Sequence, residues 1–249
     1  MKGFRPLFFG LGLLVFFLGA AAAQGDENSL SPDPDVSLAH FPSKIINDLP
    51  HFFTDENIPP LAVGSLATAL DWSLLDGQNS LAGDLQNWKT QPLWDFGNFY
   101  GVGWVEGGLG LGGWGLGALT NDLKLQEFGR DATESLLEST VVATGLKYAV
   151  GRERPDRSNN LSFPSGHSIT AFCFAPVVAR YWGWEAGVPA YLLATVTGLA
   201  RVEGDHHYLS DVLAGATLGI VIGNSVVYAP KDVSVSAGPG QVNLTWKFN

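Results

Sequence analysis

Cysteine and charge are both scarce in this sequence. Of its 249 residues only Cys173 is a cysteine, which excludes an intrachain disulfide framework and a multi-cysteine zinc site. Charged residues make up 15% of the chain, with 14 Lys and Arg against 24 Asp and Glu. The resulting net charge of −10 excludes the broad basic surface of a general nucleic-acid-binding protein, so we expect no nucleic-acid partner.

Apolar side chains and glycine are abundant instead. Hydrophobic residues make up 46% of the chain, and there are 31 glycines. A chain this apolar buries enough surface to offset the entropy lost on ordering, which excludes an intrinsically disordered protein. Its length fits one domain of ordinary size with appendages.

The first 23 residues have the pattern of a secretory signal peptide. Lys2 and Arg5 precede an apolar run at residues 7–18, and four alanines follow at residues 20–23. The apolar run is short for a bilayer span, although an uncleaved anchor helix is the alternative. We therefore predict an exported protein, periplasmic or membrane-associated, with an extracytoplasmic functional site.

An all-α domain is predicted for residues 60–229, after an irregular lead-in at residues 24–59. Glycines or polar pairs such as Asn121–Asp122, Gly151 and Gly183 separate most of its apolar segments. The segments are too long for strands and predict six helices. They lie at residues 61–76, 97–119, 129–150, 166–182, 185–202 and 207–228.

The tail has a different period. Apolar residues alternate with polar ones on both sides of Gly238-Pro239-Gly240, which predicts a short β-hairpin within residues 230–249.

Two helical faces bear on the surroundings of the domain. In the third segment Asp131, Glu134 and Glu138 share one face, which predicts solvated first turns. In the second segment the pair Gly113 and Gly117 has the spacing that allows close helix packing in lipid. We expect membrane association and leave its depth open.

The chemistry-bearing residues form three patches, and Lys147 and Arg154 belong to the first. They are seven residues apart, so they share a face if the third helix continues through its last two turns. Two cations there, with Pro155 ending the helix, form a clamp for an anion. The alternative is a basic helix C-terminus that only complements the helix dipole.

The second patch, Pro164-Ser165-Gly166-His167, opens the fourth helix. Free backbone N–H groups and the Ser165 hydroxyl are able to hold a phosphate there, and Gly166 lets the backbone come close to it. An ordinary helix start with Ser165 as N-cap is the alternative.

The third patch contains Arg201, His207 and Asp211. The last two are i and i+4, so they are neighbours if both lie on the sixth helix. Asp211 would accept the Nδ1 proton and leave Nε2 of His207 free as a nucleophile. The alternatives are a weak surface pair and a metal site that includes Asp205 and His206. We predict no metal, because the basic residues of the three patches supply the positive charge.

Together the patches resemble the signature of the type 2 phosphatidic acid phosphatase (PAP2) and vanadium haloperoxidase superfamily. The resemblance covers about residues 60–228 and implies a six-helix bundle. It implies His207 as a nucleophile that forms phosphohistidine, Asp211 as its orienter and His167 as the acid that protonates the leaving oxygen. It also implies phosphate binding by Lys147, Arg154, Ser165, Gly166 and Arg201.

The function predicted from these residues is a metal-independent phosphatase without a cofactor. Its substrate is a phosphomonoester or diphosphate, either a small molecule or a lipid of the phosphatidic acid or isoprenyl phosphate type. Arg152 and Arg157 flank the clamp and either steer anions toward it or are simply solvated. A vanadium-dependent haloperoxidase, with vanadate in the same site, and a non-catalytic membrane or anion-binding protein are the alternatives. The oligomeric state is left open.

Overall fold

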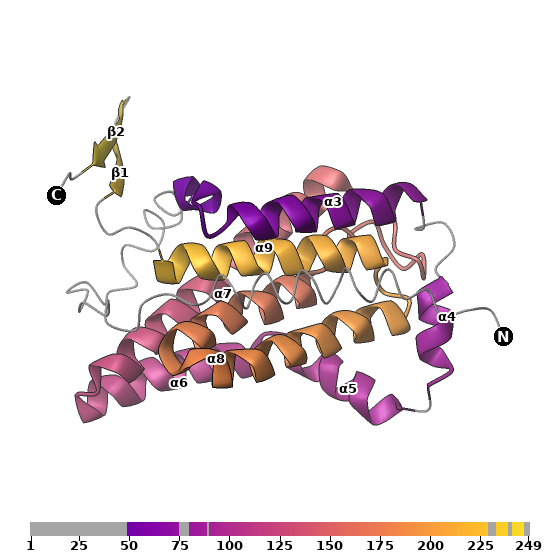
Figure 1. Ribbon diagram of the computed structural model, residues 1–249, viewed down its shortest axis with the longest axis horizontal. Coiled ribbons are helices and arrows are strands. Elements are labelled where there is room, and N and C mark those ends of the chain that lie inside the picture. The colour runs from indigo at the N-terminus through magenta and orange to yellow at the C-terminus, as the bar shows by residue number, and fades with distance from the viewer. Residues whose placement is uncertain (1–48, 75–79, 89, 229–232, 239–240, 247–249) are drawn as a thin grey trace.

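The computed structural model describes residues 49–74, 80–88, 90–228, 233–238 and 241–246 (Figure 1). The predicted signal peptide and the lead-in as far as residue 48 lie outside the described residues. The helices are η3 (Leu49–Phe53, a 3-10 helix), α3 (Ile58–Leu74), α4 (Ser80–Gln86), α5 (Gln91–Tyr100), α6 (Trp104–Thr120), α7 (Leu123–Val150), α8 (Gly166–Glu203) and α9 (Leu209–Tyr228). Strands β1 (Val233–Gly238) and β2 (Gln241–Trp246) pair antiparallel, with Val233 opposite Trp246.

The helix count differs from the six predicted segments, since the described residues contain seven α-helices. The sequence analysis missed α4 and most of α5, and the segment predicted at 97–119 is divided between α5 and α6. The break falls at Gly103, whose φ of 91° is left-handed. It also includes Gly101, where an added Cβ would lie 3.0 Å from Cβ of His167. Close packing of the chain at Gly101 was not visible in the hydropathy pattern.

Other predicted breaks are confirmed. Asn121 and Gly151 have left-handed backbones that end α6 and α7. Gly183, with φ of 75°, divides α8 into two helices that correspond to the predicted segments 166–182 and 185–202. These two helices fold back on each other, because an added Cβ at Gly187 would lie 2.6 Å from Cβ of Ala179.

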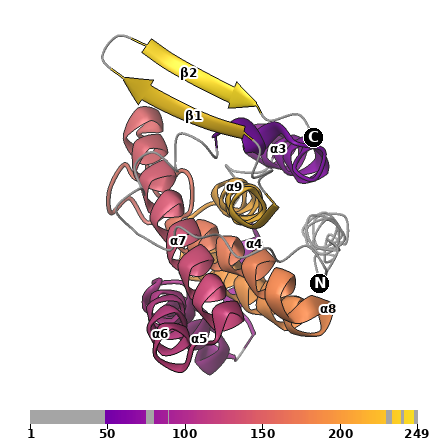
Figure 2. The same ribbon diagram turned by 90° about the vertical axis from the view of Figure 1, so that its left-hand side faces the viewer.

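The helix α9 lies at the centre of the bundle, between α3 on one side and α7 and α8 on the other (Figure 2). Gly215, Gly219 and Gly223 repeat every fourth residue along its contact with α8. An added Cβ on Gly219 would lie only 2.6 Å from the carbonyl oxygen of Ile169 in α8. Among the described residues α9 alone is long and apolar enough to cross a membrane, but 89% of its apolar window is buried inside the protein.

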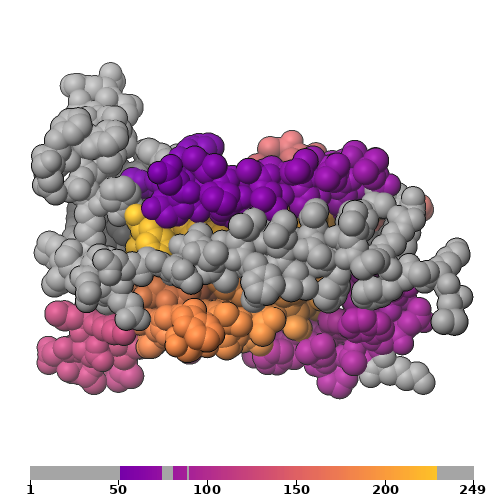
Figure 3. Space-filling view, in the orientation of Figure 1, coloured from indigo at the N-terminus to yellow at the C-terminus, as the bar shows by residue number. Residues whose placement is uncertain are grey.

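Buried amides fix α3 against α9. Asn57 donates from Nδ2 to Oγ of Ser225 at 3.1 Å, and Asn224 donates from Nδ2 to Oδ1 of Asn57 at 3.1 Å. Because these groups are buried, each hydrogen bond ties the two helices together. Figure 3 shows α3 along one border of the molecule and α8 below it. The segment predicted as irregular at 24–59 therefore ends in η3 and the first turn of α3.

The acidic face of α7 is buried, so the prediction of solvated first turns is wrong. Asp131, Glu134 and Glu138 are 4%, 2% and 2% exposed, because α7 is packed between α6 and α8. Asp131 accepts hydrogen bonds from the Tyr181 hydroxyl and from Nη2 of Arg130, both at 2.7 Å. For Asp131, the hydrogen bond from Tyr181 on α8, which periodicity does not reveal, makes the burial tolerable.

Gly113 and Gly117 of α6 face α7. An added Cβ on Gly113 would lie 3.2 Å from the Phe128 ring, and one on Gly117 would clash with the backbone of Gln126. The small-residue spacing of α6 thus serves close packing between two helices of this protein.

Candidate active site

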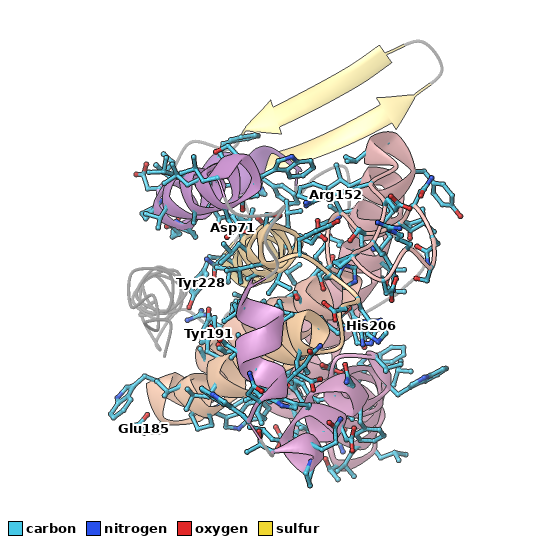
Figure 4. All side chains as sticks on the ribbon, turned by 90° about the vertical axis from the view of Figure 1, so that its right-hand side faces the viewer. Asp71, Arg152, Glu185, Tyr191, His206 and Tyr228 are labelled. Atoms are coloured by element: carbon cyan, nitrogen blue, oxygen red, sulfur yellow. The ribbon has the colours of Figure 1, made fainter. Side chains whose placement is uncertain are left out.

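The three predicted patches meet at one end of the bundle, where α7 ends and α8 and α9 begin (Figure 4). The backbone N–H of Ser165 donates to the carbonyl oxygen of Asp211 at 3.0 Å, which joins the second patch to the third. Nζ of Lys147 donates to the carbonyl oxygen of Pro164 at 2.7 Å, which joins the first patch to the second. Segments that are 64 positions apart in the sequence, from Lys147 to Asp211, thereby enclose one site.

The first patch is not a single helical face. The helix α7 ends at Val150, and Gly151 follows with a φ of 61°, so Arg154 lies in the loop beyond the helix. A clamp built on one helix, as the spacing suggested, is therefore wrong. The loop instead returns toward α8 and is held there by Lys147, whose Nζ also donates to the carbonyl oxygen of Leu161 at 2.7 Å.

Lys147 titrates at a lower pH than an ordinary lysine. Burial first, and then the charges of Arg154 and Arg201, lower its pKa to about 8, and Asp211 acts in the opposite direction. Lys147, Arg154 and Arg201 are therefore close enough for their charges to interact.

Arg154 and Arg201 each bury a guanidinium N–H group with no acceptor. In both residues Nε has no hydrogen-bond partner among the described residues. Nη1 of Arg201 donates to Oδ1 of Asn98 in α5 at 2.6 Å, which fixes the direction of its side chain. Burial and the nearby charge of Arg154 lower the pKa of Arg201 to about 10, so it stays cationic at neutral pH.

Ser165 is the N-cap of α8 and is completely buried. Its Oγ accepts hydrogen bonds from the backbone N–H of Ser168 at 3.4 Å and from the Ser168 hydroxyl at 2.9 Å. Gly166 follows as the first residue of α8, and an added Cβ there would lie 3.7 Å from Cε of Lys147. The ordinary N-cap is therefore present, and it directs the N-terminus of α8 toward the Lys147 ammonium.

His207 and Asp211 are partners although they do not share a helix. His207 lies in the turn before α9, where its backbone N–H donates to the carbonyl oxygen of Arg201 at 3.2 Å. Its Nδ1 lies 3.6 Å from Oδ2 of Asp211, and both side chains are almost completely buried. The alternative of a surface pair is therefore wrong. Burial lowers the pKa of His207 to about 4 against the opposing effect of Asp211, so its ring is neutral at neutral pH.

His167 is the second residue of α8 and lies among the same cations. Burial comes first among the causes that lower its pKa to about 3, followed by the charges of Arg201, His207 and Arg154. The two histidines thus share one electropositive site, and both are neutral in the absence of a ligand.

The sequence cluster that suggested a metal site is dispersed in space. His206 directs Nδ1 to Oδ2 of Asp156 at 3.0 Å, and Asp205 accepts a hydrogen bond from Nε2 of Gln86 at 3.0 Å. Within the described ranges no group of three or more His, Cys, Asp or Glu side chains is arranged to hold a metal ion.

The part of the chain that carries these residues is similar to a known family. Residues 130–234 match the family model of the PAP2 superfamily. The match covers less than half of the chain, and residues 130–234 are called the PAP2 region below after the family model that they match. All eight predicted site residues lie inside this PAP2 region, whereas α3, α5 and α6 precede it.

Two similar proteins have names that refer to lipid phosphates. The chain is 40% identical over 96 residues to the lipid A 1-phosphatase of Porphyromonas gingivalis, covering 37% of this chain and 21% of that protein. It is 33% identical over 92 residues to phosphatidylglycerophosphatase B of Bacillus subtilis, covering 31% of this chain and 45% of that protein. The alignments thus span less than half of each relative. No solved structure gives a significant match to the chain.

The sequence analysis missed two polar residues of the PAP2 region that contact Asp211. The Ser162 hydroxyl donates to Oδ2 of Asp211 at 2.5 Å and lies 3.5 Å from Nδ1 of His207. Arg152 donates from Nη1 to Oδ1 of Asp211 at 2.6 Å, so the alternative that it is simply solvated is wrong. Arg157 is exposed, in agreement with a solvated position. Both missed residues adjoin predicted patches, but no local pattern shows where their side chains point.

Proposed function

We propose that this protein is a metal-independent phosphatase that acts on phosphomonoesters or diphosphates carried on a lipid, through a phosphohistidine on His207. The observation that carries the proposal is the pair of buried guanidinium N–H groups of Arg154 and Arg201 that lack an acceptor among the described residues. A buried donor without a partner is costly. A phosphoryl oxygen would supply the missing acceptor and form a charge-assisted hydrogen bond.

Binding of the phosphoryl group follows from the charges around it. Lys147, Arg154 and Arg201 lie near the two histidines, and the pKa values of Lys147 and Arg201 keep both of these side chains cationic near pH 7. The N-terminus of α8 at Ser165 and Gly166 adds backbone N–H groups to this cluster. Fixed positive charge reduces the repulsion between nucleophile and dianion and stabilises the equatorial oxygens in the transition state.

The nucleophile is Nε2 of neutral His207. Its Nδ1 faces Oδ2 of Asp211, which favours the tautomer with the proton on Nδ1 and the lone pair on Nε2. Attack forms the Nε2–P bond while the bond from phosphorus to the leaving oxygen breaks. Asp211 then stabilises the positive charge that develops on the imidazole.

His167 supplies the proton to the leaving oxygen. Burial, followed by the nearby cations, holds its pKa low in the free site. A bound dianion opposes the effect of the cations, so we expect His167 to take up a proton as the substrate binds. In the second step the deprotonated ring of His167 accepts a proton from water, the water oxygen attacks phosphorus, and the Nε2–P bond breaks. Inorganic phosphate leaves, and His207 returns to its neutral form.

The surroundings of His167 favour an apolar leaving group. Gly101, between α5 and α6, contacts the His167 side chain. Phe99, Val102 and Trp104 flank this glycine and are 62%, 49% and 81% exposed. Since the leaving oxygen must approach His167, whatever is attached to it lies near these three side chains. A lipid tail would cover them, in line with the lipid phosphates in the names of the similar proteins.

Export and membrane association belong to the same proposal. Large apolar side chains are exposed on several helices, among them Leu66 and Leu70 of α3 and Leu116 and Leu119 of α6. Exposed apolar surface on this scale is typical of a contact with a membrane or a partner. A lipid surface outside the cytoplasm would place the substrate beside the α5–α6 turn.

A hydrolysis screen with the purified full chain tests the function. Long-chain phosphatidic acid and an isoprenyl diphosphate in mixed micelles would be compared with glycerol phosphate and inorganic diphosphate. We expect faster release of phosphate from the lipids, inhibition by orthovanadate and no loss of activity in EDTA. No phosphate release from any of these substrates would reject the phosphatase, and inactivation by EDTA would reject metal independence.

The nucleophile is tested by rapid acid-free quenching with a ³²P-labelled substrate. We expect an acid-labile, base-stable phosphoenzyme in the wild type and none in His207→Ala. The matched control is His206→Gln, which alters the adjacent histidine whose ring faces Asp156, and it should still form the phosphoenzyme. A labelled His207→Ala protein would reject the assignment.

A further inference from the structure

We infer that Arg152, held between the rings of Trp72 and Tyr208, is the positioning residue that fixes the Asp211 carboxylate and so orients the His207 nucleophile. The inference rests on the proposed function and extends it in one respect. It gives α3, which lies outside the PAP2 region, a part in organising the site through Trp72.

Arg152 makes four contacts that restrict its guanidinium. Nη1 donates to Oδ1 of Asp211 at 2.6 Å and to Oγ of Ser210 at 2.8 Å. Cζ lies 4.0 Å from the centre of the Trp72 ring and 4.0 Å from the centre of the Tyr208 ring. The two hydrogen bonds from Nη1 and the two aromatic rings near Cζ together fix the position and the orientation of the guanidinium. Figure 4 shows Arg152 beside α3, at the end of the bundle that carries the site.

The Asp211 carboxylate is held at both oxygens as a result. Arg152 binds Oδ1, whereas Oδ2 accepts from the Ser162 hydroxyl and from the backbone N–H of Tyr208 at 3.0 Å. With donors on each oxygen the carboxylate plane cannot rotate freely, and Oδ2 stays directed at Nδ1 of His207. Removal of Arg152 would leave Oδ1 buried without this cation and allow the plane to turn.

Arg152 also influences the charge of Asp211. Burial alone would raise the pKa of Asp211, but hydrogen bonds from His207 and Ser162 and the charge of Arg152 bring it below its ordinary value. Asp211 therefore stays ionised, as an orienter of the Nδ1–H tautomer must.

Trp72 is the means by which α3 reaches this arrangement. Its ring lies over Arg152 and also meets the Phe163 ring edge-on, with centroids 5.2 Å apart. Phe163 immediately precedes Pro164 of the second patch, so one side chain of α3 contacts both the positioning arginine and the loop that leads into α8.

Kinetics on four variants of the full chain test the inference. We expect Arg152→Gln to lower kcat about 10- to 100-fold with little change in KM, because a misplaced nucleophile reacts slowly even when substrate is bound. In a plot of kcat against pH, the acid limb is the part where kcat falls at low pH. In Arg152→Gln this limb should move to higher pH, because loss of the cation raises the pKa of Asp211. Arg152→Lys keeps the charge, so it should leave the acid limb in place and recover part of kcat.

The stacking contact has its own variant and control. Trp72→Leu should lower kcat several-fold without moving the acid limb. Trp184→Leu removes another exposed tryptophan, next to the kink in α8 and far along the bundle from the site, and should retain wild-type kcat. The inference would be overturned if both Arg152→Gln and Trp72→Leu kept the wild-type kcat and acid limb. It would also be overturned if Arg152→Gln and Arg152→Lys lost kcat equally and neither shifted the acid limb.

A second measurement does not depend on turnover. In protein labelled with ¹⁵N-histidine, the nitrogen chemical shifts of His207 report its tautomer, and we expect the Nδ1–H form in the wild type and a mixture in Arg152→Gln. An unchanged tautomer in that variant would overturn the positioning role. Failure of the proposed function would look different, because the wild type would then release no phosphate while the tautomer still responded to Arg152→Gln.

Discussion

The Ser162 hydroxyl lies 2.5 Å from Oδ2 of Asp211 and 3.5 Å from Nδ1 of His207, so it touches both members of the proposed nucleophile pair. Its backbone N–H donates to the carbonyl oxygen of Arg152 at 2.9 Å, which places the hydroxyl on the same loop as the positioning arginine. The Asp211 carboxylate is thus held from the loop before α8 as well as by the backbone N–H of Tyr208, just before α9.

Ser162→Ala should lower kcat by about 10-fold and leave KM nearly unchanged, because one donor to a buried carboxylate is lost while the phosphate-binding cations remain. Steady-state kinetics on a lipid phosphate would measure it. Ser65→Ala, a change on the exposed face of α3, is the control and should behave as wild type. A raised KM with unchanged kcat would contradict a role at Asp211.

Phosphate affinity should fall as the pH rises through about 8. Burial and the neighbouring arginines lower the pKa of Lys147 to about 8, so its cationic form, which attracts the anion, is present below that pH and lost above it. Inhibition by inorganic phosphate between pH 6 and 10 would show this loss. In Lys147→Met the affinity should be weak at every pH, with no loss near pH 8. If Lys147→Met still lost phosphate affinity near pH 8, that loss would be due to another titrating group.

The effect of replacing His167 on the rate should depend on the leaving group of the substrate. His167→Ala should slow hydrolysis of an alkyl phosphate by about 10²–10⁴-fold, since an alkoxide needs a proton to depart. A nitrophenyl phosphate leaves without that help and should lose far less. The ratio of the two rates in wild type and variant is the relevant quantity, and an equal loss on both substrates would mean that His167 is not the acid.

Glu106 should make folding stability fall between about pH 4.5 and 7. It is completely buried in α6, neither carboxylate oxygen has a hydrogen-bond partner within the described part of the chain, and burial raises its pKa to about 7. Because the folded state prefers the protonated form, the full stability is present below the unfolded pKa and declines as pH rises through the folded pKa, by about 3 kcal/mol in total.

Urea unfolding at pH 5 and pH 8 would measure this decline. Glu106→Gln cannot ionise, so its two curves should lie closer together than those of the wild type, whereas the exposed control Glu56→Gln should keep the wild-type difference. A wild-type difference in Glu106→Gln would show that another group controls the pH dependence.

The local signals of the sequence were strong for the helix ends. Gly151 and Gly183 do break the helices, because left-handed backbone favours glycine, and Ser165 does cap α8. The three patches do meet at one end of the bundle. The failures were of another kind, since Arg154 and His207 were placed on helices that end at Val150 and begin at Leu209.

The candidate chemical groups could be predicted from short segments, because the types and spacings of Lys147, Arg154 and the two histidines are local properties. The groups that complete the candidate site depend on tertiary packing. Arg152 is held by Trp72, 80 positions away, and by Asp211, 59 positions away, and these contacts depend on how α3 and α9 pack. Local periodicity distinguishes one face of a helix from the other, but it does not reveal which face meets a hydrogen-bonding partner. For that reason the buried acidic face of α7 and the inward position of Arg152 emerged only from the packed structure.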